Sequence, residues 1–333
     1  MFNLVYKLKK LNNKIKIFIV LGVVLVVVLS FIVLNSFNHL SSEYDFNDRL
    51  KNIYLSEEEA FKVEAFAKNL AVISDVSTDD ASYQPEAGLV AKIGGPDVTF
   101  ARNANKHMNP ASTTKVMTAL LALKYGKLDT EVTVGREIND VDEGSSLAGL
   151  RVGDTLSLEE LLYALLLPSG NDAANAIAVH ISGSKDAFVE LMNQEAKKLG
   201  AMHTNFENPS GLTSENHYTT AYDLYLIFNE ALKYEKFAKI AGKKNYTASY
   251  TKANGTEVIK AWSNGNRFLG NEMQKPEGVK VFAGKTGTTK AAGSCLVVAC
   301  TKEDSKYISV VLKSENKAIL YDNMYKLMQK YTN

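Results

Sequence analysis

The chain is short of histidine, and it carries almost no net charge. Its five histidines are scattered, and none of them forms a His-Glu-x-x-His or similar metal-binding spacing. We therefore expect neither a metal nor another cofactor. The formal net charge of +1 over 333 residues leaves no strongly basic domain, which argues against nucleic acid as a partner.

Cysteine is also scarce, since the chain has only Cys295 and Cys300. The two lie five positions apart in what reads as a single strand, and an odd offset puts side chains on opposite faces of a strand. A disulfide between them is therefore not expected. We predict that both are small core residues, which leaves the redox compartment undecided.

Long apolar runs are absent except at residues 17–34, where only Ser30 is polar. This run is about long enough to span a bilayer. Five lysines and no acidic residue precede it, whereas three acidic residues follow it within residues 43–48. The positive-inside rule then predicts a cytoplasmic tail at residues 1–16, a single-pass signal-anchor at 17–36 and an extracytoplasmic remainder held at the cell membrane.

A cleavable signal peptide is the alternative for the same run. Residues 35–39 read Asn-Ser-Phe-Asn-His, which is a poor cleavage site, so we favour the uncleaved transmembrane helix. Residues 37–84 are polar and read as an extracellular stalk. Ser56 followed by Glu59 predicts one short helix within it.

Residues 85–333 read as one compact domain of mixed α/β (α+β) class, because 46% of the chain is hydrophobic and the element patterns alternate in type. A hairpin is predicted at 87–93 and 98–101 around Gly-Gly-Pro-Asp. Residues 129–155 read as loop-rich, and a capping signal begins at Ser157. Helices are predicted at 112–123, 161–167, 172–181, 185–199, 220–233 and 317–331, and strands at 279–282, 296–301 and 307–312.

The first chemical motif is Ser-Thr-Thr-Lys at residues 112–115, which follows Pro110 at the expected start of a buried helix. Residues i and i+3 share one face of a helix, so the Ser112 hydroxyl and the Lys115 amine should be neighbours. That geometry would let a lysine take a proton from a serine nucleophile near the N–H groups of a helix N-terminus. Alone, the spacing is a weak signal.

Two further motifs accompany it. Ser169 and Asn171 form Ser-Gly-Asn in the turn after a buried helix, and Lys285, Thr286 and Gly287 form Lys-Thr-Gly at the end of a strand pattern. We expect Gly287 to let the backbone approach a ligand closely. In this order, the three motifs make up the set typical of penicillin-interacting serine enzymes.

Residues 85–333 resemble the catalytic domain of the serine D-alanyl-D-alanine carboxypeptidases, the low-molecular-weight penicillin-binding proteins of peptidase family S11. The likeness covers residues 110–118, 167–174, 208–212, 217–223 and 284–289. It implies a β-lactamase/transpeptidase-like fold, with an antiparallel sheet flanked by helices and an all-helical lobe. We expect the chain to lack the β-rich second domain and the C-terminal amphipathic anchor usual in the family. The Asn-x-Asn pattern at 264–266 lacks an arginine that some members carry, which leaves the role of Arg267 open.

The resemblance also implies roles for the motif residues. Ser112 would be the nucleophile, Lys115 its base and Ser169 a proton relay, and the backbone N–H groups of Ser112 and Thr288 would form an oxyanion hole. The residues expected to bind substrate are Asn171, Lys285, Thr286, Gly287 and Thr288. The implied partners are peptidoglycan stem pentapeptides, from which the terminal D-alanine is removed, and β-lactam antibiotics. We read His217 and Asp223 as a structural hydrogen-bonded pair, and Trp262 as packing.

Two alternatives remain from the sequence. A serine β-lactamase of one large class needs a Glu-x-x-Leu-Asn loop, and the nearest stretch, residues 159–163, reads Glu-Glu-Leu-Leu-Tyr on an expected helix. A non-catalytic muropeptide-binding scaffold should have lost Ser112, Lys115 or Lys285, and all three are present. The sequence does not say whether such an enzyme serves general wall maturation, division or sporulation.

Overall fold

The computed structural model describes residues 85–270 and 272–332, together with residues 12, 15, 25–26 and 28–30. Contacts divide the chain into the units Met1–Val63 and Glu64–Asn333. In the first unit the described residues 15, 25–26 and 28–30 are helical. Among all described residues, no helix is both long and apolar enough to cross a bilayer. Most of the expected anchor at 17–36 and all of the stalk at 37–84 lie outside the described residues, so both stay predictions.

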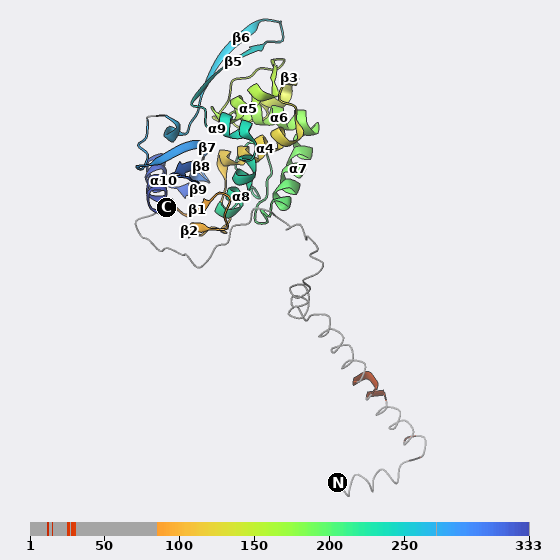
Figure 1. Ribbon diagram of the computed structural model, residues 1–333. Helices are drawn as coiled ribbons and strands as arrows, with labels where there is room; N and C mark the ends of the chain where they lie inside the picture. Colours follow the sequence, from red (N-terminus) through yellow and green to blue (C-terminus); the bar gives the residue numbers. More distant parts are fainter. Residues whose placement is uncertain are drawn as a thin grey trace, which may run out of the picture. The chain divides into compact units, whose positions relative to one another are not determined.

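The second unit is built on an antiparallel sheet with the strand order β2-β1-β9-β8-β7 (Figure 1). Its strands are β1 (Ala87–Lys92), β2 (Val98–Arg102), β7 (Val279–Thr289), β8 (Gly293–Lys302) and β9 (Ser305–Ser314). The predicted hairpin and the three late strands are confirmed. Because β1 pairs with β9, the sheet joins the two ends of the domain.

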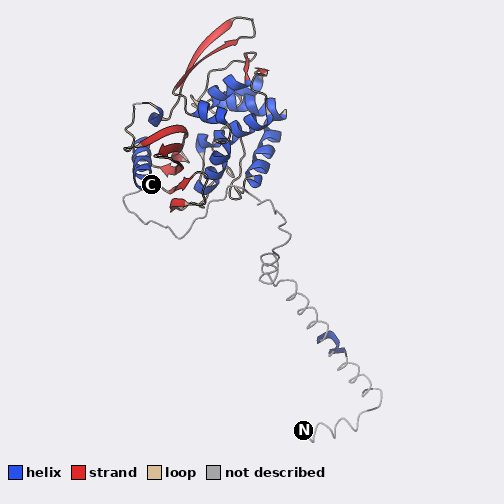
Figure 2. Ribbon diagram, viewed as in Figure 1, coloured by secondary structure: helices blue, strands red, loops and turns tan. Residues whose placement is uncertain are grey.

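Helices cover both faces of this sheet (Figure 2). Helix α10 (Lys317–Tyr331) packs on one face, and α8 packs on the other beside the remaining helices, which form the helical lobe. These are α4 (Lys115–Tyr125), α5 (Leu158–Leu166), α6 (Asn171–Ser182), α7 (Lys185–Lys198), α8 (Ala221–Ala231) and α9 (Glu235–Ala241). The capping signal before α5 is confirmed, because Ser157 Oγ accepts from Glu160 N at 3.1 Å and Glu160 Oε2 accepts from Ser157 N at 3.0 Å.

The sheet therefore separates two hydrophobic cores, and the cysteines show the division. Cys295 belongs to the core shared with the helical lobe, and Cys300 belongs to the core under α10. Both are buried and neither is in a disulfide, as predicted from their odd spacing. Burial raises the pKa of the Cys295 thiol to about 11 and that of Cys300 to about 12, so neither is reactive.

A second, smaller sheet was not predicted. Its order is β3-β4-β5-β6, from β3 (Glu131–Thr133), β4 (Thr155–Ser157), β5 (Asn245–Thr251) and β6 (Glu257–Ser263). The β5–β6 hairpin projects away from the main sheet (Figure 1). Aromatic stacking holds the hairpin to the lobe, since the centroid of the Tyr246 ring in β5 lies 3.6 Å from that of the Tyr163 ring in α5. Within the hairpin, the Tyr246 and Trp262 rings stack with 6.5 Å between centroids. Trp262 is 3% exposed, which confirms it as a packing residue.

Candidate active site

The first motif folds as a tight turn that leads into a helix. Residues Ala111–Thr114 form a 3₁₀ turn and α4 begins at Lys115, so the expected α-helical start at residue 112 is wrong by one turn. The predicted proximity still holds, because residues i and i+3 also lie close in a 3₁₀ turn. Lys115 Nζ donates a hydrogen bond to Ser112 Oγ at 3.0 Å.

Lys115 is fully buried among neutral oxygen acceptors. Besides Ser112, its Nζ donates to Asn171 Oδ1 at 2.7 Å and to the Ser210 carbonyl at 2.5 Å. Burial lowers the pKa of Lys115 well below its usual value, and the positive charge of Lys285 lowers it further, whereas Asp172 acts in the opposite direction. These surroundings favour a neutral amine beside the serine hydroxyl.

The second motif meets the third across the site. Lys285, in β7, donates from Nζ to Ser169 Oγ and to the Thr286 carbonyl, both at 2.9 Å. Burial lowers the pKa of Lys285 to about 7. Ser169 lies in the turn between α5 and α6 with φ of 65°, a left-handed conformation that costs a residue other than glycine of order 1 kcal/mol. The turn aims its hydroxyl at Lys285.

Gly287 lets the sheet lie close against the turn that carries Ser112. The predicted strand at 279–282 is longer than expected, because β7 runs on to Thr289 and Lys-Thr-Gly lies within it. A Cβ at residue 287 would lie 2.9 Å from Ser112 N and 3.0 Å from Pro110 O. The close neighbour of Gly287 is thus the backbone of residues 110–113, and any side chain here would push β7 away from Ser112.

The Ser210 carbonyl was not singled out from the sequence. Asn208 Oδ1 accepts the backbone N–H groups of Ser210, Gly211 and Leu212 at 3.2, 2.7 and 3.1 Å and so shapes the turn. Gly211 has φ of 87°, and a Cβ there would lie 1.9 Å from the Ala111 carbonyl oxygen. The composition Asn-Pro-Ser-Gly signals a turn, but it does not show which carbonyl faces Lys115.

Asp172 is a second group that the sequence analysis missed. It is 2% exposed, and its carboxylate accepts the N–H groups of Ala148, Gly149 and Leu150 at 2.8, 2.8 and 3.0 Å. These bonds fix the loop that carries Ser146, whose carbonyl accepts from Asn171 N at 2.9 Å. Asp172 thereby sets the position of one rim of the site.

His217 and Asp223 do not form the expected pair. Glu207 N donates to His217 Nδ1 at 3.0 Å, so the ring proton is on Nε2, which donates to Thr114 Oγ1 at 2.9 Å. Burial lowers the pKa of His217 to about 4, which keeps the ring neutral. Asp223 instead accepts from His203 N at 2.8 Å and Thr204 Oγ1 at 2.7 Å. Each residue is structural, and His217 braces the turn next to Lys115.

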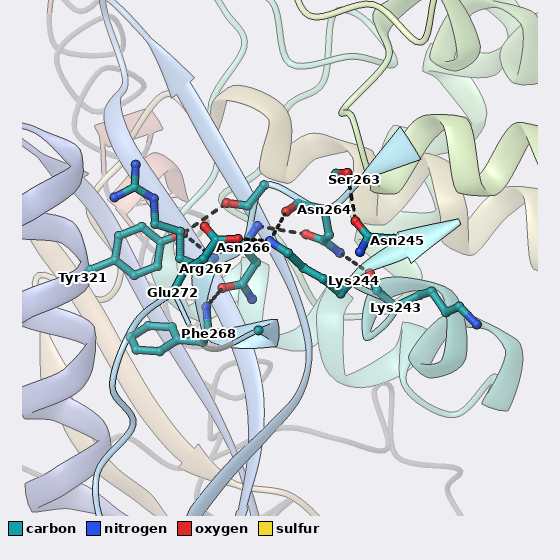
Figure 3. Close-up of polar contacts among 12 residues, drawn as sticks. Lys243, Lys244, Asn245, Ser263, Asn264, Asn266, Arg267, Phe268, Glu272 and Tyr321 are labelled. Atoms are coloured by element: carbon teal, nitrogen blue, oxygen red, sulfur yellow. Dashed lines mark hydrogen bonds and ion pairs between the residues drawn. The ribbon is translucent and has the colours of Figure 1, made fainter. Parts of the chain in front are cut away.

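In the Asn-x-Asn pattern, both asparagine side chains accept backbone N–H groups and so fix the turn that precedes and includes Arg267 (Figure 3). Asn264 Oδ1 accepts from Asn266 N at 2.9 Å, and Asn266 Oδ1 accepts from Phe268 N at 3.1 Å. Arg267 N donates to Tyr321 Oη at 3.0 Å, and its guanidinium lies 5.8 Å from the Tyr321 ring centroid. The exposed Arg267 side chain is thereby positioned at the cleft.

Two cavities meet at Ser112 and share Ser112, Ser146 and Thr288 in their linings. The first, of about 250 Å³, continues past Ser169, Thr286 and Gly287 toward the α10 side; we name it the carboxylate-side cavity. The second, of about 430 Å³, is lined by Asn171 and Gly211 and continues past residues 142–145 and 288–290; we name it the acyl-side cavity. Within the described residues no group of three metal-ligating side chains occurs.

The predicted site residues thus come together around one cleft. Ser112, Ser169, Thr286, Gly287 and Thr288 line the carboxylate-side cavity, and Asn171 lines the acyl-side cavity. The two lysines lie behind Ser112 and Ser169, to which they donate. Three motifs converging in this way define the class of penicillin-interacting serine proteins.

Comparison with known proteins gives the family. Residues 77–316 match the family model described as Peptidase_S11, D-alanyl-D-alanine carboxypeptidase. The chain belongs to this family.

Individual relatives agree with that assignment. The chain is 34% identical to D-alanyl-D-alanine carboxypeptidase DacF of Bacillus subtilis, over 75% of this chain and 62% of DacF. It is 32% identical to DacC of Escherichia coli, over 78% of this chain and 64% of DacC. The chain thus spans less than two thirds of either relative.

Among solved structures, the Streptomyces K15 DD-transpeptidase matches with a TM-score of 0.69 and 30% identity, over 74% of this chain and 96% of that one. The mixed α/β fold with antiparallel sheets and helices, expected from the sequence, is therefore confirmed.

Proposed function

We propose that the protein is a serine-type D-Ala-D-Ala carboxypeptidase. It removes the terminal D-alanine from peptidoglycan stem pentapeptides through an acyl-enzyme on Ser112, and penicillin acylates the same residue. The observation that carries the proposal is the 3.0 Å contact between Ser112 Oγ and a lysine that is buried among neutral acceptors. Membership of the carboxypeptidase family supports it.

Acylation starts when neutral Lys115 accepts the Ser112 proton as Oγ bonds to the carbonyl carbon of the penultimate D-alanine. The backbone N–H groups of Ser112 and Thr288 stabilise the resulting oxyanion, a contribution of about 3 kcal/mol per donor in comparable enzymes. The C–N bond then breaks as Ser169 gives its proton to the leaving amine, and the proton that Lys115 took from Ser112 passes to Ser169, so that Lys115 is neutral again. Lys115 then takes a proton from the water that attacks the ester carbonyl and returns it to Ser112 Oγ as the ester bond breaks.

The terminal carboxylate of the substrate lies in the carboxylate-side cavity. Thr286 and Thr288 supply hydroxyl donors there, and Arg267 supplies a positive charge. Arginine suits this role because its planar guanidinium can donate two parallel hydrogen bonds to a carboxylate. The hydrogen bond from Asn266 N to Asn264 Oδ1 and the one from Arg267 N to Tyr321 Oη hold the segment that carries Arg267.

The test uses the full chain incubated with labelled penicillin and a peptide ending in D-Ala-D-Ala. Mass spectrometry should locate the label on Ser112, and Ser112→Ala should abolish both labelling and D-alanine release. Ser146→Ala, a change in the same cleft, is the control and should keep labelling. Label on Ser169, or normal turnover by Ser112→Ala, would refute the mechanism.

The β-lactamase alternative finds no support at residues 159–163. Glu160 is used in the cap of α5, and Glu159 pairs with Lys236 at 2.9 Å. Neither lines the cavities at Ser112. A long-lived penicilloyl-enzyme in the labelling experiment would separate the two activities.

We further propose that residues 17–36 anchor the protein in the cell membrane, with residues 1–16 in the cytoplasm and the catalytic domain outside. The proposal rests on the apolar run and the lysines before it. The mature protein should keep its N-terminus and stay with membranes through a salt wash. N-terminal sequencing that starts near residues 36–42 would instead identify a cleaved signal peptide.

A further inference from the structure

The two cavities at Ser112 differ in charge. Arg267 and Lys317 line the carboxylate-side cavity, and none of its lining residues is acidic. The acyl-side cavity is lined by Asp142, Glu143 and Lys290, so acidic side chains outnumber basic ones. A peptide with charged groups along its length would therefore bind in one direction.

The difference in charge between the two cavities determines which part of a substrate binds in each. Ser112 is common to both, so a scissile carbonyl at Ser112 with its carboxylate toward Arg267 puts the residue before D-Ala-D-Ala in the acyl-side cavity. The acyl-side lining is then the part of the cleft next to that residue. The acyl-side cavity can therefore discriminate between peptides that differ in that residue.

A buried donor in the acyl-side cavity points independently to a bound peptide. Asn171 is 4% exposed, and its Oδ1 accepts from Lys115. Its Nδ2 donates to no residue that the structure describes, although Asn171 lines the cavity. This amide N–H group is open to the cavity, where a backbone carbonyl of the substrate can accept its hydrogen bond.

The charged side chains that line this cavity form no ion pair within the described residues. Within the described chain, neither carboxylate, of Asp142 or of Glu143, is in an ion pair, and the Lys290 ammonium is in none. Asp142 and Glu143 come from the loop after the 3₁₀ turn Arg136–Asn139, whereas Lys290 follows β7. The acidic wall thus belongs to the helical lobe and faces the sheet side of the cavity.

We propose that the acyl-side cavity is a subsite for a free side-chain ammonium on the residue before D-Ala-D-Ala, held by Asp142 and Glu143. The substrate class is then a stem peptide whose diamino acid has an unmodified amine. A peptide acylated at that amine, as in a cross-link, loses the contact. This inference rests on the proposed function.

The test compares two peptides on the full chain: Nα-acetyl-L-Lys-D-Ala-D-Ala and its Nα,Nε-diacetyl counterpart. Partly exposed ion pairs contribute up to about 1 kcal/mol each, so two carboxylates should give a roughly tenfold higher kcat/KM for the free amine. That ratio should fall as salt is added. The double variant Asp142→Asn/Glu143→Gln should lower kcat/KM for the free-amine peptide more than for the diacetyl peptide and so bring the ratio close to one.

The matched control is Glu303→Gln/Asp304→Asn, an adjacent acidic pair in the turn between β8 and β9, which should keep the wild-type ratio. Equal kcat/KM for both peptides with the wild-type protein overturns the subsite and leaves the proposed function intact. An equal loss on both peptides in the Asp142/Glu143 variant also overturns it. Release of D-alanine from neither peptide overturns the proposed function itself.

Discussion

The two buried lysines have the same chemistry but lie in different walls of the cleft. Lys115, in the helical wall, donates to oxygen atoms of three separate segments, at Ser112, Asn171 and Ser210. Lys285, in the strand wall, donates to Ser169 and to the carbonyl of its own neighbour, Thr286. Neither has a carboxylate as hydrogen-bond partner.

Their titration differs for a physical reason. Burial alone lowers the pKa of Lys285 to about 7, whereas Lys115 combines burial with repulsion from Lys285 and has a pKa well below its usual value. Lys115, which contacts Ser112, is thus the lysine whose neutral form is favoured both by burial and by a neighbouring positive charge. Environments that push apart the pKa values of two like groups assign one as base and the other as cation.

The largest expected effect comes from removing the base. Lys115→Ala should lower the rate of penicillin acylation by about 10²–10⁴-fold, because general-base catalysis contributes about that much. Lys124→Ala, in the same helix but facing Glu195, is the control and should acylate normally. A Lys115→Ala protein that acylates at nearly the native rate would show that another group is the base.

The second prediction concerns Lys285, and it is about pH. In the wild-type protein Lys285 holds its proton below about pH 7 and loses it above, so kcat/KM should fall as pH rises through 7. Lys285→Arg stays protonated throughout and should remove this alkaline limb, at a cost of about tenfold in rate from altered geometry at Ser169. Lys285→Ala should lose about 100-fold. A limb that persists in the arginine variant would contradict the assignment.

A substitution at Asp172 should have a smaller effect, and it should affect only one of the two lysines. The charge of Asp172 raises the pKa of Lys115, but it is not a cause of the lowered pKa of Lys285. Asp172→Asn should move the acid limb of the pH profile, where Lys115 becomes protonated, to lower pH. Loss of charge-assisted bonds to Ala148, Gly149 and Leu150 should also lower the free energy of unfolding by about 2 kcal/mol.

The control is Asp186→Asn, in the first turn of α7, which should leave both the profile and chemical denaturation unchanged. An alkaline limb that shifts together with the acid limb would show that Asp172 acts on both lysines.

Local patterns predicted much of the fold. The β1–β2 hairpin, the helix after Ser157 and α10 were all predicted because periodicity and caps lie within each segment. Helix α9 and the β5–β6 hairpin were not predicted. The hairpin is held by stacking on Tyr163, which lies about eighty residues earlier in the chain, and no local pattern carries that contact.

The contacts in the site also divide into those that a local pattern predicts and those that it does not. The Ser112–Lys115 contact follows from one helical step, whereas the hydrogen bond between Ser169 and Lys285 was not predicted, because the two residues lie 116 positions apart. The Ser210 carbonyl and the loop bound by Asp172 involve backbone groups, and the local sequence pattern does not show where such groups point. The expected His217–Asp223 pair is wrong because each side chain finds a nearer backbone N–H donor, at Glu207 and at His203.

The two cysteines give the domain a pair of chemical reporters. Cys295 and Cys300 are five residues apart on β8, yet each is sealed in a different core. A thiol reagent can reach either one only after local opening, so its labelling rate measures the stability of that layer alone. Undocking of α10 would expose Cys300 while Cys295 stayed protected, and loosening of the helical lobe would do the reverse. Strand β8, next to the Lys-Thr-Gly segment of β7, therefore reports which side of the sheet opens first.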